Sequence, residues 1–312
     1  MEKIFKLNPS LHANIWGGNK LRGYGKVSDA DRIGESWELS FVPSAPATLD
    51  DGRSTVEAIP KELWGTRAEH FDFFPVLTKF IDAKEKLSVQ VHPDDEYALA
   101  NEGQYGKSEM WYVVDADEGA GLYMGLSERT ELSTLAEKIA DGTVEELLSF
   151  KRVKAGDVFF IPAGTIHAIG GGVLIYEIQQ NSTLTYRLYD YMRRDKDGNL
   201  RELHVEKALK VLTPDVYSYE TEDGKAGDGK LIGKCEYFTT KEYTGSATLT
   251  VDEGSFLMIT AVKGAGVLSF KDSVGVNREI KIDLGETYFA PASKDDFEVK
   301  VDGDITFITV TV

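Results

Sequence analysis

A pattern of turn, strand and corner occurs twice in this chain, and the repetition limits the folds that the sequence can adopt. Residues 156–164 contain Gly-Asp, an apolar run and Pro-Ala-Gly, while residues 285–293 contain Gly-Glu, a strand-type run and Pro-Ala-Ser. Turn residues that bracket a short run of β-branched and aromatic residues are typical of a strand between tight turns. The repetition therefore predicts two β domains of the jelly-roll type.

The division into domains follows from the length and from changes of composition along the chain. With 312 residues, the chain is longer than an ordinary single domain. Residues 220–229 are acidic and rich in glycine, as linkers are, and we place the boundary there. We predict a first domain over residues 1–227 and a carboxy-terminal domain over residues 228–312.

Residues 126–150 interrupt the strand pattern of the first domain. Apolar residues recur there at helical spacing, and Thr143-x-x-Glu146 matches the capping box of a helix start. The segment carries no pair of ligand-type residues, so we expect a helical insertion that covers or supports the β domain. The expected fold is mainly β, with two jelly-roll domains and a helical insertion in the first.

The composition argues against several classes of protein. Hydrophobic residues make up 42% and charged residues 28% of the chain, which is typical of a soluble globular protein. The formal net charge of −17 argues against a nucleic acid partner, because phosphates would be repelled. A membrane-spanning helix needs about 20 apolar residues, and no apolar run in this sequence is nearly that long. We also see no basic-then-apolar leader peptide. Cys235 is the only cysteine, which excludes an intrachain disulfide and a cysteine-based zinc site. We expect a cytoplasmic protein without a membrane partner.

Two polar residues of ligand type stand in the strand-like residues 88–92. Side chains alternate between the faces of a strand, so Gln90 and His92 point the same way while the valines between them face a core. Pro93 cannot donate to a sheet, and Asp94 is a good N-cap for the helical run that follows. The strand is thus expected to end where its two polar groups are presented.

Two further residues of ligand type are placed by turns and strands. Residues 156–164 lead through a Pro-Ala-Gly corner to His167, which begins the next segment. In the strand-like residues 106–114, Lys107 and Glu109 share one face. Histidine and glutamate are common metal ligands, although each of these residues taken alone is equally compatible with a structural role.

Charged residues also interrupt strands that are otherwise apolar. Lys79 lies in residues 74–81; such a lysine is usually a solvated edge charge, but it becomes an anion-binding group if it faces the Gln-His strand. Glu177 lies on the face of its strand opposite to Tyr176. Residues 34–40 alternate as a strand with Glu35 and Trp37 on one face, and we expect Trp37 to be a core residue.

Arg187 stands among aromatic residues in the strand-like residues 185–191. Burial of an unpaired guanidinium would cost several kcal/mol. We therefore expect Arg187 to face an open pocket or to pair with a carboxylate such as Asp190.

The two corner motifs together suggest jelly rolls of the cupin type. The first cupin motif normally contains His-x-His with a nearby glutamate, whereas this chain has Gln90-x-His92 with Glu109 farther along. Where the first corner leads to His167, the second leads to Asp296, and no histidine follows residue 204. We expect two cupin-type domains, of which only the first holds a metal.

The chain closely resembles type I mannose-6-phosphate isomerase, in the short form of many bacteria. The resemblance covers most of residues 1–215 and is weaker beyond them. It is carried by several motifs in the same order: residues 16–18, 34–38, 90–93, 106–109 and 162–191.

The resemblance implies a single Zn²⁺ site in each chain. The zinc ligands of that family fall on His92, Glu109 and His167, and Gln90 occupies the position of a fourth ligand in longer members. Gly171 departs from the second cupin motif, which usually has asparagine there.

The resemblance also implies residues that act on the substrate. Arg187 corresponds to the active-site arginine of the family, and Lys79 and Lys107 correspond to lysines that line its pocket. Glu177 corresponds to a glutamate near the metal that is a candidate acid or base.

The function implied is the interconversion of mannose 6-phosphate and fructose 6-phosphate through an enediol or enediolate. A metal can stabilise the negative charge at the substrate oxygens, and a carboxylate or histidine must carry the proton. The alternatives are another metal cupin, such as a different sugar isomerase or an oxygenase, and a non-catalytic sugar-binding cupin. The implied partner is a small sugar phosphate, and we expect a monomer or weak dimer.

Overall fold

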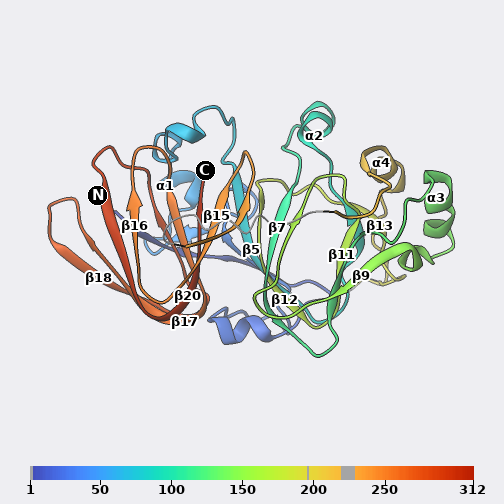
Figure 1. The fold of residues 1–312 in the computed structure, drawn as a ribbon, viewed down its shortest axis with the longest axis horizontal. Helices are drawn as coiled ribbons and strands as arrows, with labels where there is room; N and C mark the ends of the chain where they lie inside the picture. Colours follow the sequence, from blue (N-terminus) through green and yellow to red (C-terminus); the bar gives the residue numbers. More distant parts are fainter. Residues whose placement is uncertain (1–2, 195–196, 219–228) are drawn as a thin grey trace.

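The computed structural model describes residues 3–194, 197–218 and 229–312, and its strands form three sheets (Figure 1). The orange and red strands of the carboxy-terminal part lie at the left of Figure 1, and the green strands of the earlier part lie at the right. The chain is mainly β, which confirms the predicted fold class. The predicted linker, residues 220–229, lies outside the described residues except for Gly229.

The first sheet is antiparallel and has six strands. Its strands in spatial order are β10 (Val158–Ile161), β7 (Glu109–Ala116), β12 (Val173–Gln180), β5 (Val76–Ala83), β3 (Glu35–Leu39) and β2 (Ser10–His12). All eight residues of β12 and of β5 are buried, so both faces of the sheet are covered.

The second sheet has five strands. They are, in order, β13 (Tyr186–Tyr189), β6 (Val89–Val91), β11 (His167–Ile169), β8 (Gly121–Leu126) and β9 (Leu148–Arg152). The strand predicted around Gln90 is thus central in a sheet, next to the strand that begins with His167.

The third sheet has nine strands and is built mostly from the end of the chain. Its main path is β14 (Lys230–Lys234), β15 (Thr239–Thr244), β20 (Phe297–Thr311), β17 (Leu257–Lys271), β19 (Thr287–Ala290), β1 (Phe5–Asn8) and β4 (Thr48–Leu49). In addition, β16 (Ala247–Val251) pairs with β20, and β18 (Asn277–Ile282) pairs with β17. The sheet takes strands from both sides of residue 228, where the domain boundary stays a prediction.

The described helices are short. The α-helices are α1 (Thr55–Ala58), α2 (Asp95–Glu102), α3 (Leu132–Ala140) and α4 (Val205–Val211), and the 3₁₀-helices are η1 (Lys20–Tyr24), η2 (Lys61–Leu63), η3 (Thr66–Ala68) and η4 (Val144–Leu147). Asp94 caps α2 as predicted, accepting a hydrogen bond from the backbone N–H of Tyr97. The capping box predicted at Thr143 is wrong, because its hydroxyl donates to Asp141 and η4 has no side-chain cap.

The insertion predicted at residues 126–150 contains α3 and η4, which cover the outer face of the five-stranded sheet (Figure 1). Val89 and Val91 point to that outer face and pack in one cluster with Leu135 of α3 and Ala208 of α4. The neighbouring positions on β6 therefore point inward, toward the six-stranded sheet.

The outer face of the six-stranded sheet packs against the carboxy-terminal sheet. Phe80 of β5 and Tyr176 of β12 share a core cluster with Met258 and Phe289. The Tyr176 hydroxyl is 2.9 Å from Thr260 Oγ1, a buried polar contact between the two sheets. The six-stranded sheet is thus supported by the carboxy-terminal strands, and the five-stranded sheet is supported by helices.

A buried ion pair lies in the same interface. Lys26 Nζ is 2.8 Å from a carboxylate oxygen of Glu38, and both side chains are at most 5% exposed. Ser36 and Thr287 also donate to this carboxylate, at 2.6 and 3.2 Å. Thr287 is in β19 and Glu38 is in β3, so the pair joins the two sheets.

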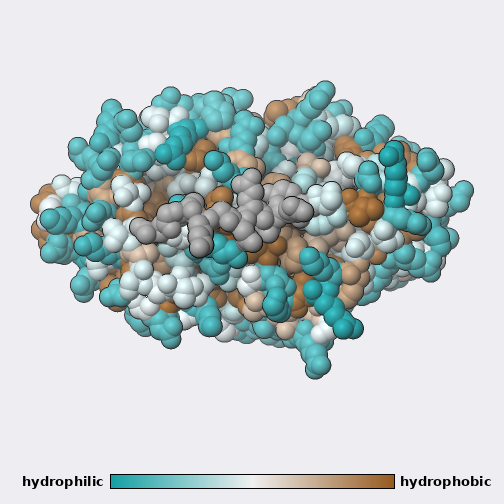
Figure 2. Space-filling model, in the orientation of Figure 1, coloured by the Kyte–Doolittle hydropathy of each residue, from teal (hydrophilic) through white to brown (hydrophobic). Residues whose placement is uncertain are grey.

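On the face shown in Figure 2, hydrophilic residues cover most of the outline, and hydrophobic residues gather near the middle. Among the described residues, no helix combines the length and the hydropathy needed to cross a membrane.

We expect Lys26→Met to lower the free energy of unfolding by about 3–5 kcal/mol, because it leaves the Glu38 carboxylate buried and unpaired. Lys6→Met is the matched control, since the Lys6–Glu286 pair is partly exposed and worth about 0–1 kcal/mol. Urea unfolding of both variants measures the difference. Equal losses in the two variants would contradict the interpretation of the buried pair.

Candidate metal centre

Three strands of the five-stranded sheet place a row of polar side chains on its inner face. Gln90 on β6 is opposite His167 of β11 on one side and opposite Arg187 of β13 on the other. His92 follows the last residue of β6 and points to the same face as Gln90. Pro93 comes next and has no N–H to continue the ladder, which explains why the strand ends here.

The facing six-stranded sheet supplies a carboxylate to this row. Glu109 begins β7, and its Oε1 is 3.1 Å from His92 Nε2, while its Oε2 is 3.8 Å from His167 Nε2. Ligand atoms of the three residues all lie within 4.8 Å of one another, and no side chain is more than 1% exposed. The structure thus brings together the three residues that the sequence predicts as metal ligands.

The donor atoms of the cluster fit a metal ion. Both ring nitrogens of His92 and both carboxylate oxygens of Glu109 are buried and make no hydrogen bond to the described residues, although Lys107 Nζ forms an ion pair with Glu109 Oε1. His167 Nδ1 is 2.9 Å from the carbonyl oxygen of Thr165, which can only accept, so Nδ1 carries the hydrogen and Nε2 keeps its lone pair. Two imidazoles and a carboxylate are a donor set that zinc accepts.

The electrostatics of the cluster keep its donors in the metal-binding forms. Burial, assisted by the nearby Lys107 ammonium, lowers the pKa of His92 to about 3, and burial also lowers the pKa of His167. Burial alone would raise the pKa of Glu109, but Lys107 and His92 outweigh it, and the pKa lies well below its usual value. At neutral pH the histidines are therefore neutral and the glutamate is ionised.

A second row of side chains crosses the inner face of the six-stranded sheet. Strand register places Trp111, Glu177, Lys79 and Trp37 on four neighbouring strands. Trp111 Nε1 donates to Glu177 Oε2 at 3.0 Å, and Lys79 Nζ is 3.3 Å from Glu177 Oε1. Lys79 also lies 5.0 Å from the centre of the Trp37 ring and 3.7 Å from Glu35 Oε2. The interpretation of Lys79 as a solvated edge charge is therefore wrong.

The pKa values of the two carboxyl groups beside Lys79 shift in opposite directions. Burial, then the charge of Glu109, raises the pKa of Glu177 even though Lys79 opposes the shift. Burial also acts to raise the pKa of Glu35, but Lys79 and the indole N–H of Trp37 lower it overall. Glu177 is thus the group of this row whose pKa moves toward neutrality.

Glu35 is a site residue that sequence reasoning missed. The alternation of residues 34–40 places Glu35 and Trp37 on one face. That signal gives no indication that the face lies opposite Lys79, because the pairing of β3 with β5 is long-range.

Two of the predicted site residues contact neighbours other than those expected. Gln90 Nε2 is 3.3 Å from His167 Nε2, and Gln90 Oε1 accepts a hydrogen bond from Ser88, so ligation by Gln90 stays a prediction. Lys107 Nζ is 3.0 Å from Glu109 Oε1 and is paired with the cluster itself.

Arg187 is half-buried and contacts only neutral oxygens among the described residues. Its Nε donates to Ser88 Oγ at 3.3 Å, and its Nη1 donates to the Glu202 carbonyl at 2.9 Å. Asp190, the expected partner, pairs instead with Arg193 and Arg201. Burial, then the Arg201 charge, lowers the pKa of Arg187.

Three buried donor groups held between two sheets, next to a second row with a titratable carboxyl, define the class of the protein. It is a mainly β protein that carries a metal-type centre and an acid–base candidate between two facing sheets. Comparison with known proteins gives the family.

A family model for the catalytic domain of phosphomannose isomerase type I matches residues 4–131. The chain is 39% identical to the mannose-6-phosphate isomerase ManA of Bacillus subtilis (strain 168) over 279 residues, which cover 85% of this chain and 87% of that protein. It is 37% identical to the mannose-6-phosphate isomerase of Streptococcus mutans over 276 residues, 85% of this chain and 86% of that protein.

The fold agrees with these sequence relationships. The crystal structure of the mannose 6-phosphate isomerase from Bacillus subtilis is 34% identical and superposes with a TM-score of 0.88, covering 100% of both chains. The chain therefore belongs to the type I phosphomannose isomerase family, which confirms the resemblance seen in the sequence.

The two buried histidines predict that metal-free protein loses stability in acid. The pKa of His92 is about 3 in the folded chain against 6.5 for an ordinary histidine, so the unfolded state binds more protons between these values. The contribution is fully present above pH 6.5 and is lost as the pH falls below it. We expect losses of up to about 1.4 kcal/mol per pH unit from His92, measured by urea unfolding after chelator treatment.

The comparison with His92→Gln isolates this contribution from those of other groups. The variant removes one titrating group, so its free energy of unfolding should depend less on pH than that of the parent protein. The range to compare is pH 6.5 to 4.5, which lies between the ordinary pKa values of histidine and glutamate. An identical slope in the two proteins would show that His92 does not titrate in this way.

Proposed function

We propose that this chain interconverts mannose 6-phosphate and fructose 6-phosphate with one zinc ion bound by His92, Glu109 and His167. The observation that carries the proposal is the cluster of buried donor atoms on these three residues, in a chain of the type I phosphomannose isomerase family. Within the cluster, the ring nitrogens of His92 and the carboxylate oxygens of Glu109 make no hydrogen bond to the described residues. A cytoplasmic location and a monomeric or weakly dimeric state remain predictions.

The donor set suits zinc in a catalytic setting. Three protein ligands leave a coordination position open for substrate, whereas a structural zinc site is closed by four. When bound, zinc would supply a Lewis acid for the negative charge that develops on the sugar oxygens as C2 loses its proton. Gln90 is adjacent to His167 and is a candidate for a fourth contact.

Glu177 is the residue we assign to proton transfer between C1 and C2, by way of an enediolate. Burial and the Glu109 charge raise its pKa, which suits a carboxyl group that must both accept and return a proton. Trp111 holds one carboxyl oxygen and Lys79 lies beside the other, so the carboxyl is fixed in direction. A protein that only bound sugar would not need such a group.

Arg187 is the residue we assign to the anionic substrate, with Lys79 and Lys107 lining the pocket. Its guanidinium meets only neutral oxygens in the described structure, so its charge is available to a phosphate or to sugar oxygens. Its planar fork of N–H groups can hold two oxygens in one fixed bidentate geometry, which an ammonium group does not provide. Basic side chains that can hold a phosphate group also favour a sugar-phosphate isomerase over a cupin oxygenase.

We expect His92→Ala, Glu109→Ala and His167→Ala each to lose bound zinc and isomerase activity together. Loss of a residue that only hydrogen-bonds to a metal ligand typically weakens metal binding by about 10–100-fold. Loss of a ligand itself should weaken zinc binding by more than that. Gln90→Ala should have a smaller effect, because an amide oxygen is a neutral and weaker donor. Elemental analysis and an assay with mannose 6-phosphate measure both properties.

His70→Ala is the control for this series, since His70 is 56% exposed and outside the cluster. It should keep both zinc and activity. Full zinc occupancy in His167→Ala would contradict the proposed ligand set.

We expect Arg187→Lys to keep the fold and the bound zinc but to lose about 100-fold in kcat/KM, which is about 2.7 kcal/mol of transition-state binding. The reason is that lysine keeps the charge and loses the bidentate geometry. Steady-state kinetics and a thermal melt on the same sample separate catalysis from stability.

Arg194→Lys is the matched control, because Arg194 is exposed in the same segment. If Arg187 were only structural, its variant would show a lower Tm with near-normal turnover. That outcome would remove Arg187 from the proposed site.

A further inference from the structure

Three guanidinium groups gather around one carboxylate at the end of β13. Asp190 follows that strand, and its Oδ1 pairs with Arg193 and lies 3.3 Å from Arg201 Nη1. Arg187 lies on the strand itself, and its Nη1 donates to the backbone carbonyl of Glu202, the residue after Arg201. The cluster therefore carries more positive than negative charge, although the chain as a whole has a net charge of −17.

The backbone beside this cluster is strained, and the strain fixes one of its ion pairs. Tyr191 and Met192 both have a φ of 54°, and the Arg193 N–H closes the turn on the Asp190 carbonyl at 3.0 Å. Turns with two such left-handed residues normally contain glycine, asparagine or aspartate, and strain of this kind concentrates at functional sites. All three guanidinium nitrogens of Arg193 already donate, to the Asp190 carboxylate and to backbone carbonyls. Arg193 is thus the fixed partner of Asp190.

Arg201 is much less engaged than Arg193. Its only hydrogen bond to the described residues is the 3.3 Å contact with Asp190, so two of its guanidinium nitrogens have no partner there. Its side chain is 23% exposed and is therefore accessible from solvent. Burial lowers the pKa of Arg201, and the carboxylates of Asp190 and of Glu35 on the facing sheet act in the opposite direction. The guanidinium of Arg201 thus lies within electrostatic reach of the six-stranded sheet.

Arg187 and Arg201 are close enough to repel each other. Burial, then the charge of Arg201, lowers the pKa of Arg187. Like charges held together disfavour each other unless an opposite charge is supplied, and Arg193 already takes the nearby Asp190. An anion between the two guanidinium groups would remove the repulsion. A phosphate fits this role, because its oxygens match the donor forks of arginine.

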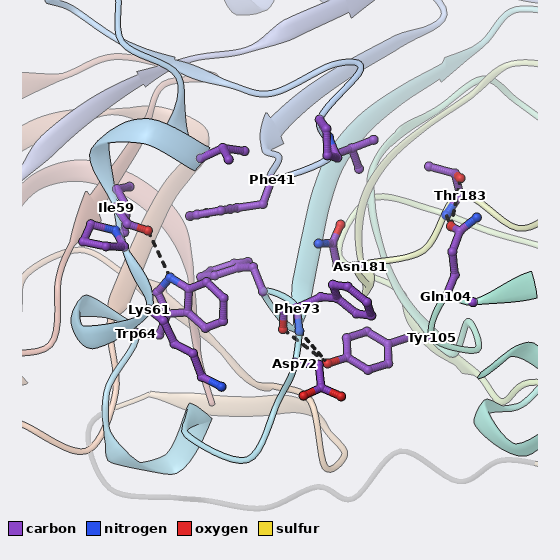
Figure 3. A pocket seen from close by; sticks show the side chains of 16 residues that line it. Phe41, Ile59, Lys61, Trp64, Asp72, Phe73, Gln104, Tyr105, Asn181 and Thr183 are labelled. Atoms are coloured by element: carbon purple, nitrogen blue, oxygen red, sulfur yellow. Dashed lines mark hydrogen bonds between the residues drawn. The ribbon is translucent and has the colours of Figure 1, made fainter.

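The cavity shown in Figure 3 offers no comparable site. Its volume is about 530 Å³, and aromatic rings such as those of Phe41 and Tyr105 bound it. The residues that line it include one basic side chain, Lys61, which donates to a backbone carbonyl, and one acidic side chain, Asp72. An excess of positive charge is thus a property of the arginine cluster and not of this cavity.

We propose that Arg201 is a further substrate-binding residue, which holds the phosphate of the sugar together with Arg187. Arg193 neutralises Asp190, and Asp190 in turn orients the guanidinium of Arg201. The inference rests on the proposed isomerase function, since it takes a sugar phosphate as the ligand. It adds a second guanidinium to the site, so the phosphate is held from two sides.

The first test compares Arg201→Gln with the parent zinc-loaded protein. Sorbitol 6-phosphate is the binding probe, because it has no carbonyl group to isomerise and calorimetric titration gives its Kd without turnover. We expect Arg201→Gln to raise this Kd, and the KM for mannose 6-phosphate, at least about tenfold, as for loss of a hydrogen bond between charged groups. Zinc content should be unchanged, and kcat should change by less than about threefold.

Two further variants serve as controls for this comparison. Arg201→Lys keeps the charge and loses the fork, so its Kd should lie between those of the parent and Arg201→Gln. Arg194→Gln removes an exposed positive charge from the same segment and should leave the Kd within about twofold. A thermal melt of each sample reports whether the variant is folded.

A double variant separates direct binding from an effect through Asp190. Loss of Arg201 also removes a partner of Asp190, whose charge would then repel the phosphate. Asp190→Asn combined with Arg201→Gln has no such charge. Direct binding predicts that the double variant still binds sorbitol 6-phosphate at least about fivefold more weakly than Asp190→Asn alone. Equal Kd values in these two variants would overturn the proposal.

The measurements distinguish failure of this inference from failure of the proposed function. If the parent protein isomerises mannose 6-phosphate while Arg201→Gln keeps the parental Kd and KM, only the role of Arg201 is overturned. If the parent protein binds sorbitol 6-phosphate through Arg201 without isomerising mannose 6-phosphate, only the proposed function is overturned. A parent protein that neither binds nor isomerises would overturn both.

Discussion

A carboxylate and two imidazoles that meet between two facing sheets are the interaction on which the rest of the structure depends. Glu109 comes from the six-stranded sheet, and His92 and His167 come from the facing sheet. Groups this deeply buried are costly unless they are paired or hold a metal. The two sheets must therefore be held at a separation that keeps the three side chains within 4.8 Å.

The packing behind each sheet provides that rigidity. Strand alternation that turns Gln90 inward also turns Val89 and Val91 outward onto α3 and α4. On the other side, Tyr176 faces the carboxy-terminal sheet and contacts Thr260, while its neighbour Glu177 faces the site. Strands β6 and β12 thus each pack on a supporting core with one face and present a functional side chain on the other. The carboxy-terminal sheet contributes to the site by fixing the position of β12.

Local sequence signals predicted the parts of the site that depend on alternation, caps and corners. The inward direction of Gln90, the cap at Asp94 and the helical insertion are of this kind, since each depends on residues only a few positions apart. The contact of Lys79 with Glu35 could not be predicted in this way, because it depends on the register between β5 and β3. The capping box at Thr143 was wrong for a different, local reason: the hydroxyl donates to the carboxylate of Asp141, two residues earlier.

The distribution of charge explains how a chain with a net charge of −17 can attract an anion. The lysines of the six-stranded side are paired with carboxylates, Lys79 with Glu177 and Lys107 with Glu109. In the five-stranded sheet, Asp190 is engaged by other arginines, so the charge of Arg187 is left facing neutral oxygens. For the proposed substrate, this asymmetry favours one orientation: the phosphate lies toward Arg187, and the reacting carbons lie toward Glu177 and the metal ligands. In the proposed function, the pairing of Asp190 with Arg193 and Arg201 keeps its carboxylate from neutralising the Arg187 guanidinium that would hold the phosphate.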